Sequence, residues 1–468
     1  MLQSKNHALT QENRNVMQET QENKFNGRSP DVVVIGGGPG GSTMAAVLAD
    51  KGYDVVVFEK AHHPRFHIGE SLLPMNMPLF DRLGLRQAVE QIGIMKYGAE
   101  FVSPYHDHTS NFDFADALDK NFPYSVQVRR SELDELLFRH AASRGARTFE
   151  GCRVGRVDFE NDQGPERRPI VKVKGEDGVE QEWRPRFVID ASGRDTLLSN
   201  QLSAKKRHPK HTSAALFGHF RGARRAPGRR EGNISLFWFD HGWFWYIPLR
   251  DGTTSIGAVA SPKYFKTRQS DPSTFLMETI ALAPKLAERL VGATLLEPAT
   301  ATGNYAYDSK FCRGDRFMLV GDAFAFVDPM FSTGVYLAMN SAFEGSKAVD
   351  HWLKGEMGMA NKCFKNYDRL MVHGPKIFSW FIYRITSPAI RNLFMYPRNL
   401  FRMQEAMLSI LAGDVYRHTP VWPRLMAFKC IYYLSCLGNF PNAFQRWKWR
   451  RGVIKDSLNE PLKVEEKF

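Results

Sequence analysis

Cysteine is scarce in this chain of 468 residues, and the few cysteines form no motif. The five are scattered without a C-x-x-C pair, at Cys152, Cys312, Cys363, Cys430 and Cys436. This excludes a disulfide framework, a zinc ribbon and a cysteine-ligated iron–sulfur cluster. The pattern is typical of a protein in the reducing cytoplasm, and we expect no metal site.

Long apolar runs are also missing, since no uninterrupted segment approaches the ~20 residues that a membrane helix requires. The first 28 residues are rich in Gln, Asn, Glu and Lys and have no apolar core or small-residue cleavage site, so they are not a secretory signal. Residues 1–28 are expected to form a disordered leader. The chain also lacks an internal repeat.

Acidic residues are outnumbered by basic ones, and the formal net charge is +13. A basic protein attracts anions, which leaves open an anionic lipid surface, an acidic protein partner or a solvated surface around an anionic cofactor. Nucleic acid is not expected as a partner, because no nucleic-acid motif accompanies the charge. Hydrophobic residues make up 43% and charged residues 24%, as in ordinary globular proteins. The length allows two or three domains, or one large domain with insertions.

A glycine-rich loop follows the first buried strand. The strand Asp31–Ile35 leads into Gly36-Gly37-Gly38-Pro39-Gly40-Gly41, a helix begins at Ser42, and a second strand, Asp54–Phe58, ends at Glu59. This order is that of a dinucleotide-binding unit, in which the glycines allow a tight turn, close phosphate approach and helix packing. The predicted cofactor contacts here are Gly36, Gly38, Gly41, Ser42 and Glu59, with the acid facing ribose hydroxyls and the pyrophosphate at the helix start.

The rest of the chain predicts an α/β fold with an inserted antiparallel sheet. The pattern of hydrophobic residues indicates an amphipathic helix over 131–143. It indicates strands over 154–157, 170–173, 186–189, 214–220, 234–239, 243–248, 254–259 and 317–320. We expect a discontinuous FAD-binding domain over 29–360, a substrate sheet interleaved over about 75–128 and 205–305, and a helical region over 361–468.

Three ordered segments resemble the flavoprotein hydroxylase superfamily, whose fold is that of para-hydroxybenzoate hydroxylase. They are Ile189-Asp190-Ala191-Ser192-Gly193-Arg194, Val320-Gly321-Asp322-Ala323 with Asp328-Pro329 and Gly334, and Arg130-Ser131-Glu132-Leu133-Asp134. The resemblance implies that FAD is the cofactor, in a three-layer Rossmann-like domain. Asp322 would then bond the ribityl chain, Gly334 face the isoalloxazine and Arg130 lie beside the phosphates. It also implies cofactor contacts from Arg65, Val154, Pro329 and a flap that contains Gly69-Glu70-Ser71.

Two further segments resemble the flavin-dependent halogenases. Gly242-Trp243-Phe244-Trp245-Tyr246-Ile247-Pro248 is similar to their W-x-W-x-I-P signature, and Trp243 and Trp245 would line the active site from one face of a strand. Lys96-Tyr97-Gly98 is similar to their K-x-G element. The resemblance makes Lys96 the catalytic lysine, which receives hypohalous acid and delivers halogen to the substrate. A desolvated lysine with a lowered pKa suits this role.

The turn Phe331-Ser332-Thr333-Gly334 resembles the halide site of that family. Backbone N–H groups at a helix start bind anions, so Thr333 and Gly334 are the predicted halide ligands. The tryptophan halogenases have a glutamate where this chain has Phe331. The departure points to the branch that acts on phenols or pyrroles, some of which are tethered to an acidic carrier protein.

The resemblance implies an enzyme that uses FADH2, O2 and chloride or bromide to halogenate an electron-rich ring in secondary metabolism. A second glycine-rich dinucleotide unit is absent from the sequence, so a separate flavin reductase is the expected partner. The alternatives are an aromatic hydroxylase of the same fold, or a flavin-binding partner or reductase that acts on isoprenoid lipid. The apolar segment 427–440 and the basic-aromatic run 446–451 fit either carrier or membrane-surface docking, or a packed helix with a solvated end.

Overall fold

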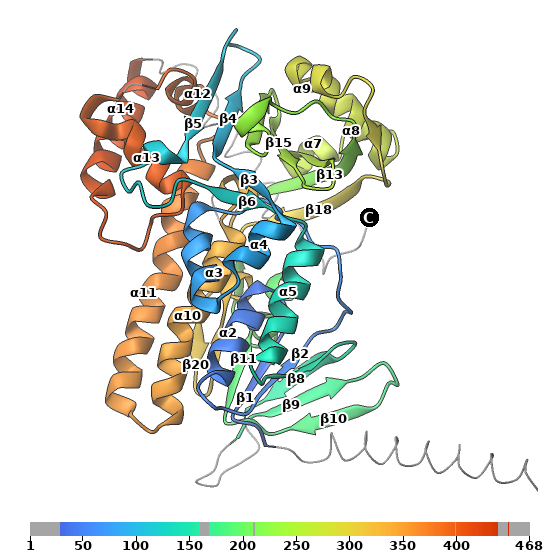
Figure 1. Cartoon of the computed structure of the whole chain (residues 1–468), viewed down its shortest axis with the longest axis vertical. Coiled ribbons are helices and arrows are strands. Elements are labelled where there is room, and N and C mark those ends of the chain that lie inside the picture. The colour runs from blue at the N-terminus through green and yellow to red at the C-terminus, as the bar shows by residue number, and fades with distance from the viewer. Residues whose placement is uncertain (1–28, 160–167, 209–210, 398, 439–447, 449–468) are drawn as a thin grey trace, which may run out of the picture.

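The computed structural model describes residues 29–159, 168–208, 211–397, 399–438 and 448. The predicted leader 1–28 and the basic-aromatic run 446–451, apart from Lys448, lie outside these residues. Figure 1 shows a lower body built on a parallel sheet, a second sheet above it, and long helices along one side.

The lower body is built on a six-stranded sheet. The central strands are continuous runs of apolar residues, VVVI and VVVF, and every residue in them is buried, as expected for parallel strands covered on both faces. All pairs are parallel except the one at the β20 edge. In spatial order the strands are β20 (Arg313–Gly314), β21 (Phe317–Leu319), β11 (Phe187–Asp190), β1 (Val32–Ile35), β2 (Val55–Phe58) and β7 (Arg147–Phe149).

Three helices and a small sheet complete the three layers of this body (Figure 1). One face of the parallel sheet carries α2 (Pro39–Ala49), α5 (Arg130–Ser143) and α10 (Gly334–Leu353). The small antiparallel sheet contains β8 (Arg153–Asp158), β9 (Ile170–Lys174) and β10 (Glu180–Trp183). Its Trp183 packs on Phe58 and Phe149 of the parallel sheet, at 5.3 and 6.0 Å between ring centroids.

The second large sheet, which we call the substrate sheet, has eight strands and is antiparallel except where β14 meets β4. Its two faces enter different cores. Trp243 and Trp245 face the core shared with the lower body, whereas Phe244 and Tyr246 face helices α8 (Pro272–Ala281) and α9 (Pro284–Arg289). Its strands are β17 (Thr294–Leu295), β13 (Ser213–Arg221), β16 (Thr253–Ala260), β15 (Gly242–Pro248), β14 (Ile234–Phe239), β4 (Gly98–Val102), β5 (Thr109–Asp113) and β18 (Thr300–Tyr305).

Short elements connect the two bodies. The hairpin-like pair β3 (Ile94–Lys96) and β6 (Ser125–Gln127) lies between them, and β12 (Lys205–Arg207), β19 (Tyr307–Ser309) and β22 (Ala325–Phe326) form another small sheet. The short helices are α3 (Met77–Leu83), α4 (Arg86–Ile92), α6 (Leu197–Gln201) and α7 (Pro262–Phe265). The 3-10 turns are η1 (Pro74–Asn76), η2 (Phe114–Asp116), η3 (Gly193–Asp195), η4 (Gly228–Arg230), η5 (Gly321–Ala323), η6 (Pro329–Phe331) and η7 (Leu400–Arg402).

The C-terminal region is helical throughout its described part. Its helices are α11 (Met357–Ile382), α12 (Pro388–Met395), α13 (Met403–Leu411) and α14 (Val421–Gly438). Helix α11 packs along α10, and α12 lies beside β4 and β5 (Figure 1). No helix in the described part of the chain has the length and apolarity needed to cross a membrane.

The predicted fold class is confirmed: a parallel FAD-type domain is interleaved in sequence with an antiparallel sheet and followed by helices. The predicted strand over 234–239 coincides with β14, and those over 214–220 and 254–259 lie inside β13 and β16. The first helix begins at Pro39 rather than Ser42, because proline is well suited to the first turn of a helix.

Candidate functional site

One cavity of about 1930 Å³ runs between the two sheets and joins most of the predicted site residues. It begins at the glycine loop, passes the segment Pro64–Ser71, which we call the flap, and reaches the start of α10 and the substrate sheet. Its walls include Gly36, Gly38, Glu59, Arg65, Gly69, Glu70, Ser71, Arg130, Val154, Trp243, Trp245, Asp322, Pro329, Thr333 and Gly334.

Three glycines of the loop serve different steric purposes. Gly36 has a φ of +101°, and an added Cβ would lie 2.4 Å from the Ala191 carbonyl oxygen. A Cβ on Gly41 would lie 1.9 Å from the Gly36 carbonyl oxygen, so this glycine permits the helix to pack on the turn. Gly38 is different, because its nearest neighbour would be Arg65 at 3.7 Å and its face is turned to the cavity.

The start of α2 presents unpaired N–H groups to the same space. Gly38 is the N-cap and provides no side-chain cap, and the first turn has no acidic residue. Helix α2 therefore offers the partial positive charge that stabilises a phosphate. Ser42 and Gly41 do not line the cavity. The Ser42 hydroxyl donates to the Gly37 carbonyl oxygen at 2.9 Å and so stabilises the turn that precedes the helix.

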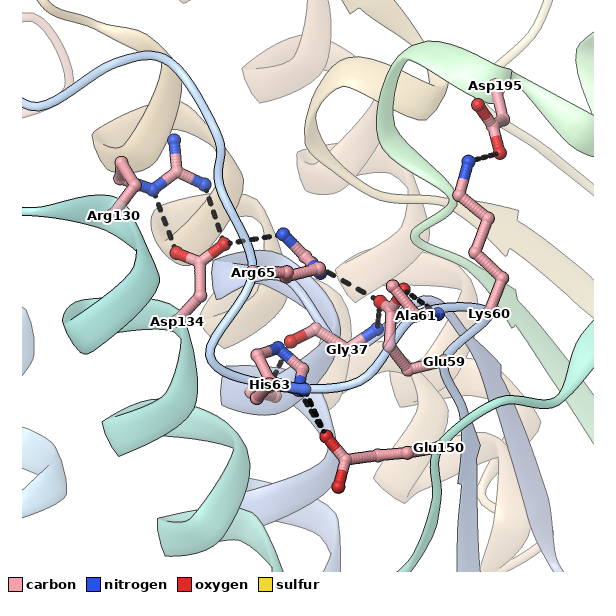
Figure 2. Close-up of polar contacts among 11 residues, drawn as sticks. Gly37, Glu59, Lys60, Ala61, His63, Arg65, Arg130, Asp134, Glu150 and Asp195 are labelled. Atoms are coloured by element: carbon pink, nitrogen blue, oxygen red, sulfur yellow. Dashed lines mark hydrogen bonds and ion pairs between the residues drawn. The ribbon is translucent and has the colours of Figure 1, made fainter. Parts of the chain in front are cut away.

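Glu59 and Asp134 hold two arginines at the cavity wall (Figure 2). Glu59 accepts hydrogen bonds from the Gly37 amide at 2.8 Å, the Ala61 amide at 3.1 Å and Arg65 at 3.3 Å. Arg65 also donates to Asp134 at 3.2 Å. Its Nε is buried without a hydrogen-bond partner in the described structure, so Arg65 can still donate to an anion.

Arg130 makes the second arginine contact with Asp134. Its Nε and Nη2 donate to the two carboxylate oxygens at 2.8 and 3.0 Å (Figure 2), and its Nη1 donates to the Ile68 carbonyl oxygen at 2.8 Å. Burial is the largest influence and raises the pKa of Asp134, but Arg130 together with His67 and Arg65 more than offsets it and keeps the pKa of this carboxyl below its usual value. The pair stays ionised, which fixes Arg130 between the flap and α5.

Asp322 and the start of α10 form the next part of the wall. Burial raises the pKa of Asp322 to about 6, although the charges of Arg194 and Arg130 oppose this shift. Thr333 is the N-cap of α10, and the first turn of this helix has neither a side-chain cap nor an acidic residue. The amides that begin at Gly334 therefore form a second anion-binding helix start on the same cavity.

Lys96 is buried, with 2% of its surface exposed, at the end of β3. Its ammonium donates to the Ser71 hydroxyl and to the Leu72 carbonyl oxygen, both at 2.9 Å. Burial lowers the pKa of Lys96 to about 7. Ser71 lines the cavity but Lys96 does not, so the lysine lies directly behind the serine.

Trp243 and Trp245 line the cavity from adjacent positions on one face of β15. Their rings lie 6.3 Å apart, and the Trp245 Nε1 donates to the Ser255 hydroxyl at 3.1 Å. Trp245 lies flat over Gly257, where an added Cβ would come within 2.2 Å of the indole. Because Gly257 has no side chain, the indole of Trp245 can lie this close to β16.

Phe331 departs from the predicted position at the site. Its ring is buried against Phe378 and Phe381 of α11, at 6.0 to 6.3 Å between centroids, and is not among the residues that line the cavity. The reason is that Ser332 has a φ of +56°, which turns the chain between Phe331 and Thr333. The helical C-terminal region therefore covers this side chain.

Several polar residues at the site were not predicted. His219 on β13 bonds the Glu70 carboxylate at 2.8 Å, and Asp328 accepts from Ser213 at 2.7 Å and lies 3.1 Å from His211. These pairs join segments that are more than 100 residues apart, and local sequence patterns carry no signal for such contacts. The described residues contain no cluster of side chains suited to a metal ion.

The fit to FAD rests on this geometry. A dinucleotide pyrophosphate must lie close to the backbone and beside the positive end of a helix dipole. Gly36 and Gly38 permit the close approach, and the start of α2 provides the positive end. The orphaned Nε of Arg65 supplies a further donor, and Asp322 lies farther along the cavity toward the start of α10. These features would hold the two phosphates and the ribityl chain in that order.

Known proteins with similar sequences include halogenases of two kinds. The tryptophan 2-halogenase of Chondromyces crocatus is 35% identical over 337 residues, which are 71% of this chain and 63% of that enzyme. The 1H-pyrrole-2-carbonyl-(peptidyl-carrier protein) chlorinase of Pseudomonas fluorescens is 30% identical over 412 residues, or 82% and 89% of the two chains. The chain thus spans less than two thirds of the first enzyme and most of the second.

A solved structure agrees with these relatives. The myxobacterial chondrochloren halogenase CndH superposes with a TM-score of 0.72 at 32% identity, and the match covers 84% of this chain and 92% of that chain. The fold and the cavity define a flavoprotein, and the FAD binding domain family matches residues 29–368. Within that class, the chain belongs to the flavin-dependent halogenases.

Proposed function

We propose that this protein halogenates an electron-rich aromatic ring with reduced FAD, dioxygen and chloride or bromide. The observation that carries the proposal is Lys96, a lysine buried beside the FAD cavity with its pKa lowered to about 7. Maintaining a buried amine that is half neutral near pH 7 opposes the ordinary preference of lysine for water. A role in chemistry explains why the chain keeps it there.

The proposed reaction uses the neutral amine of Lys96. When bound, reduced FAD supplies hypohalous acid from dioxygen and halide. The Lys96 amine takes the halogen, giving an N-halo amine and water. The substrate ring then takes the halogen, and the proton it loses passes to the nitrogen, which restores the amine. Ser71 and the Leu72 carbonyl oxygen fix the nitrogen in place, at 2.9 Å each.

Thr333 and Gly334 are the proposed halide ligands. Their amides begin a helix of 20 residues, and no acidic side chain in its first turn competes for them. Thr333 is nearly fully buried, so an anion at this point would be shielded from water. Such a place suits a halide that must meet the flavin rather than solvent.

The proposed substrate is a phenol, with a pyrrole as the second choice. Phe331 replaces the glutamate that supports attack by an unactivated indole, so the substrate must activate its own ring. One relative is named a tryptophan 2-halogenase and another a chlorinase of a pyrrolyl group on a carrier protein. The carrier-bound form is compatible with the net charge of +13, since carrier proteins of this kind are acidic.

The test supplies photoreduced FAD, halide and a panel of phenols, pyrroles and tryptophan to the purified protein and measures products by mass. We expect a halogenated phenol from the wild-type chain. Lys96→Ala should still bind FAD and consume reduced FAD, but lose at least about 100-fold of the halogenated product, the lower end of the losses typical of a positioned catalytic group. A hydroxylated product without halogen would support the hydroxylase alternative, and undiminished halogenation by Lys96→Ala would remove the lysine from the reaction.

A further inference from the structure

The flap is attached to the substrate sheet by two neighbouring side chains of β13. Phe217 and His219 are two positions apart on this strand, so they point to the same face. The flap residue Phe66 stacks on Phe217 at 6.0 Å and meets the edge of His219 at 5.9 Å. Phe66 is nevertheless 57% exposed, so this contact can open without disturbing the core.

A polar contact completes the attachment. The His219 Nε2 lies 2.8 Å from the Glu70 Oε1, and Glu70 is only 4% exposed. Within the described structure, His219 is the only side chain that pairs with this carboxylate. A buried carboxylate without a partner is strongly unfavourable, so the position of the Glu70 side chain depends on His219.

Glu70 is directly joined to the residue that contacts Lys96. Its carbonyl oxygen accepts from the Val128 amide at 2.8 Å, and the next residue, Ser71, accepts from the Lys96 ammonium at 2.9 Å. Ser71 also forms a bridge with Gln127 of β6, the strand that pairs with β3 and hence with Lys96. A displacement of Glu70 would therefore move Ser71 relative to the lysine.

Strand β13 also contacts the tryptophans of β15 that line the cavity. Phe217 lies 5.8 Å from Trp245 between ring centroids, and β13 is paired with β16 along its whole described length after Ser213. Phe66, Phe217, Trp245 and Trp243 thus form a continuous row of rings from the flap into the cavity. The sheet therefore holds the flap through both a ring stack and the hydrogen bond between His219 and Glu70.

We propose that His219 is a positioning residue that latches the flap to the substrate sheet and so holds Ser71 in contact with Lys96. The latch closes the cavity over FAD and keeps the oxidant on the path from flavin to lysine. The part of this inference that concerns Lys96 rests on the proposed function, whereas the closing of the flap does not.

The test compares two substitutions of His219 in the full-length, FAD-loaded protein. His219→Leu removes the partner of Glu70, and His219→Gln retains an N–H donor. Trypsin cleavage after Arg65, followed by mass spectrometry, reports opening of the flap. We expect cleavage to be about ten times faster in His219→Leu and within about twofold of wild type in His219→Gln, as local opening predicts.

The second readout is the amount of halogenated product per reduced flavin consumed. His219→Leu should lower this ratio about fivefold at an unchanged rate of flavin consumption, and His219→Gln should restore it. Arg221→Gln, an exposed position two residues farther along β13, is the matched control and should behave as wild type in both assays. Phe66→Ala, at an exposed position, should open the flap even if His219→Leu fails to fold.

Two results would overturn the latch. Wild-type rates of Arg65 cleavage in both His219→Leu and Phe66→Ala would show that these contacts do not hold the flap. Equal loss in His219→Leu and His219→Gln would show that bulk rather than the bond to Glu70 matters. If the wild-type protein made no halogenated product, the proposed function would fail, yet the cleavage assay would still decide whether the latch exists.

Discussion

The lysine at position 96 and the serine at position 71 show how a buried amine is held in place without a neighbouring carboxylate. Lys96 has two oxygen acceptors within 2.9 Å and no carboxylate among the causes of its shifted pKa, which is lowered by burial alone. An adjacent acid would stabilise the charged form and make the amine unreactive at neutral pH. The neutral acceptors fix the nitrogen without doing so.

This environment predicts the pH dependence of the reaction. Since the pKa of Lys96 is about 7, the amine is mostly protonated at pH 6 and mostly neutral at pH 8. Product formation should therefore rise about tenfold between pH 6 and 8 and level off above that, because only the neutral amine can accept halogen. The measurement is product per reduced flavin consumed at each pH.

A control separates this titration from that of Asp322, whose pKa of about 6 lies nearby. FAD binding measured over the same pH range should show any effect of Asp322 and none of Lys96. A product ratio that stays constant from pH 5.5 to 8 would contradict the assignment of the lysine.

At the scale of the element, we expect one glycine of the loop before α2 to be needed for folding and another for cofactor binding. A methyl group on Gly41 would meet the Gly36 carbonyl oxygen at 1.9 Å, whereas one on Gly38 would meet no atom closer than 3.7 Å. Gly41→Ala should thus destabilise the protein by about 3 kcal/mol, as overpacking does. Gly38→Ala should change stability by less than about 0.5 kcal/mol yet weaken FAD binding at least tenfold, because its methyl enters the cavity.

Thermal unfolding without added FAD and a fluorescence titration with FAD measure these two quantities. Both variants change one glycine to alanine within four residues of chain, so each serves as the control for the other. A Gly38→Ala protein that bound FAD as tightly as wild type would contradict a pyrophosphate at this loop.

Elements of this kind were predictable from the sequence because their signals are local. The runs at 32–35 and 55–58 are apolar at every position, and the two tryptophans on β15 face one side because strand residues alternate. The contacts of Lys96 with Ser71 and of His219 with Glu70 span 25 and 149 positions, and they depend on how three segments meet. Phe331 was expected at the site because its turn resembles the halide site of the halogenases, whereas its ring packs against Phe378 and Phe381 of α11, a contact for which the local sequence carries no signal.

At the scale of the whole molecule, the part of the chain that the structure describes provides one dinucleotide-binding unit and one cavity suited to FAD. The sequence has no second glycine-rich unit for a nicotinamide cofactor. We therefore expect NADH or NADPH alone to reduce the bound FAD at least 100-fold more slowly than the same nicotinamide with an added flavin reductase. Bleaching of the flavin absorbance under anaerobic conditions measures both rates.

An unrelated flavin reductase is the appropriate partner in this assay, because the proposal requires only that reduced FAD reach the cavity. Rapid reduction by nicotinamide alone would indicate a direct hydride path and would favour the hydroxylase alternative.

Ser71 lies between the cavity and Lys96, so its side chain affects which molecules can reach the amine. In the proposed function, a hypohalous acid would pass the Ser71 hydroxyl before it meets the amine. The bulk of the side chain at position 71 would then decide which oxidants reach Lys96, so this position would act as a filter for the oxidant.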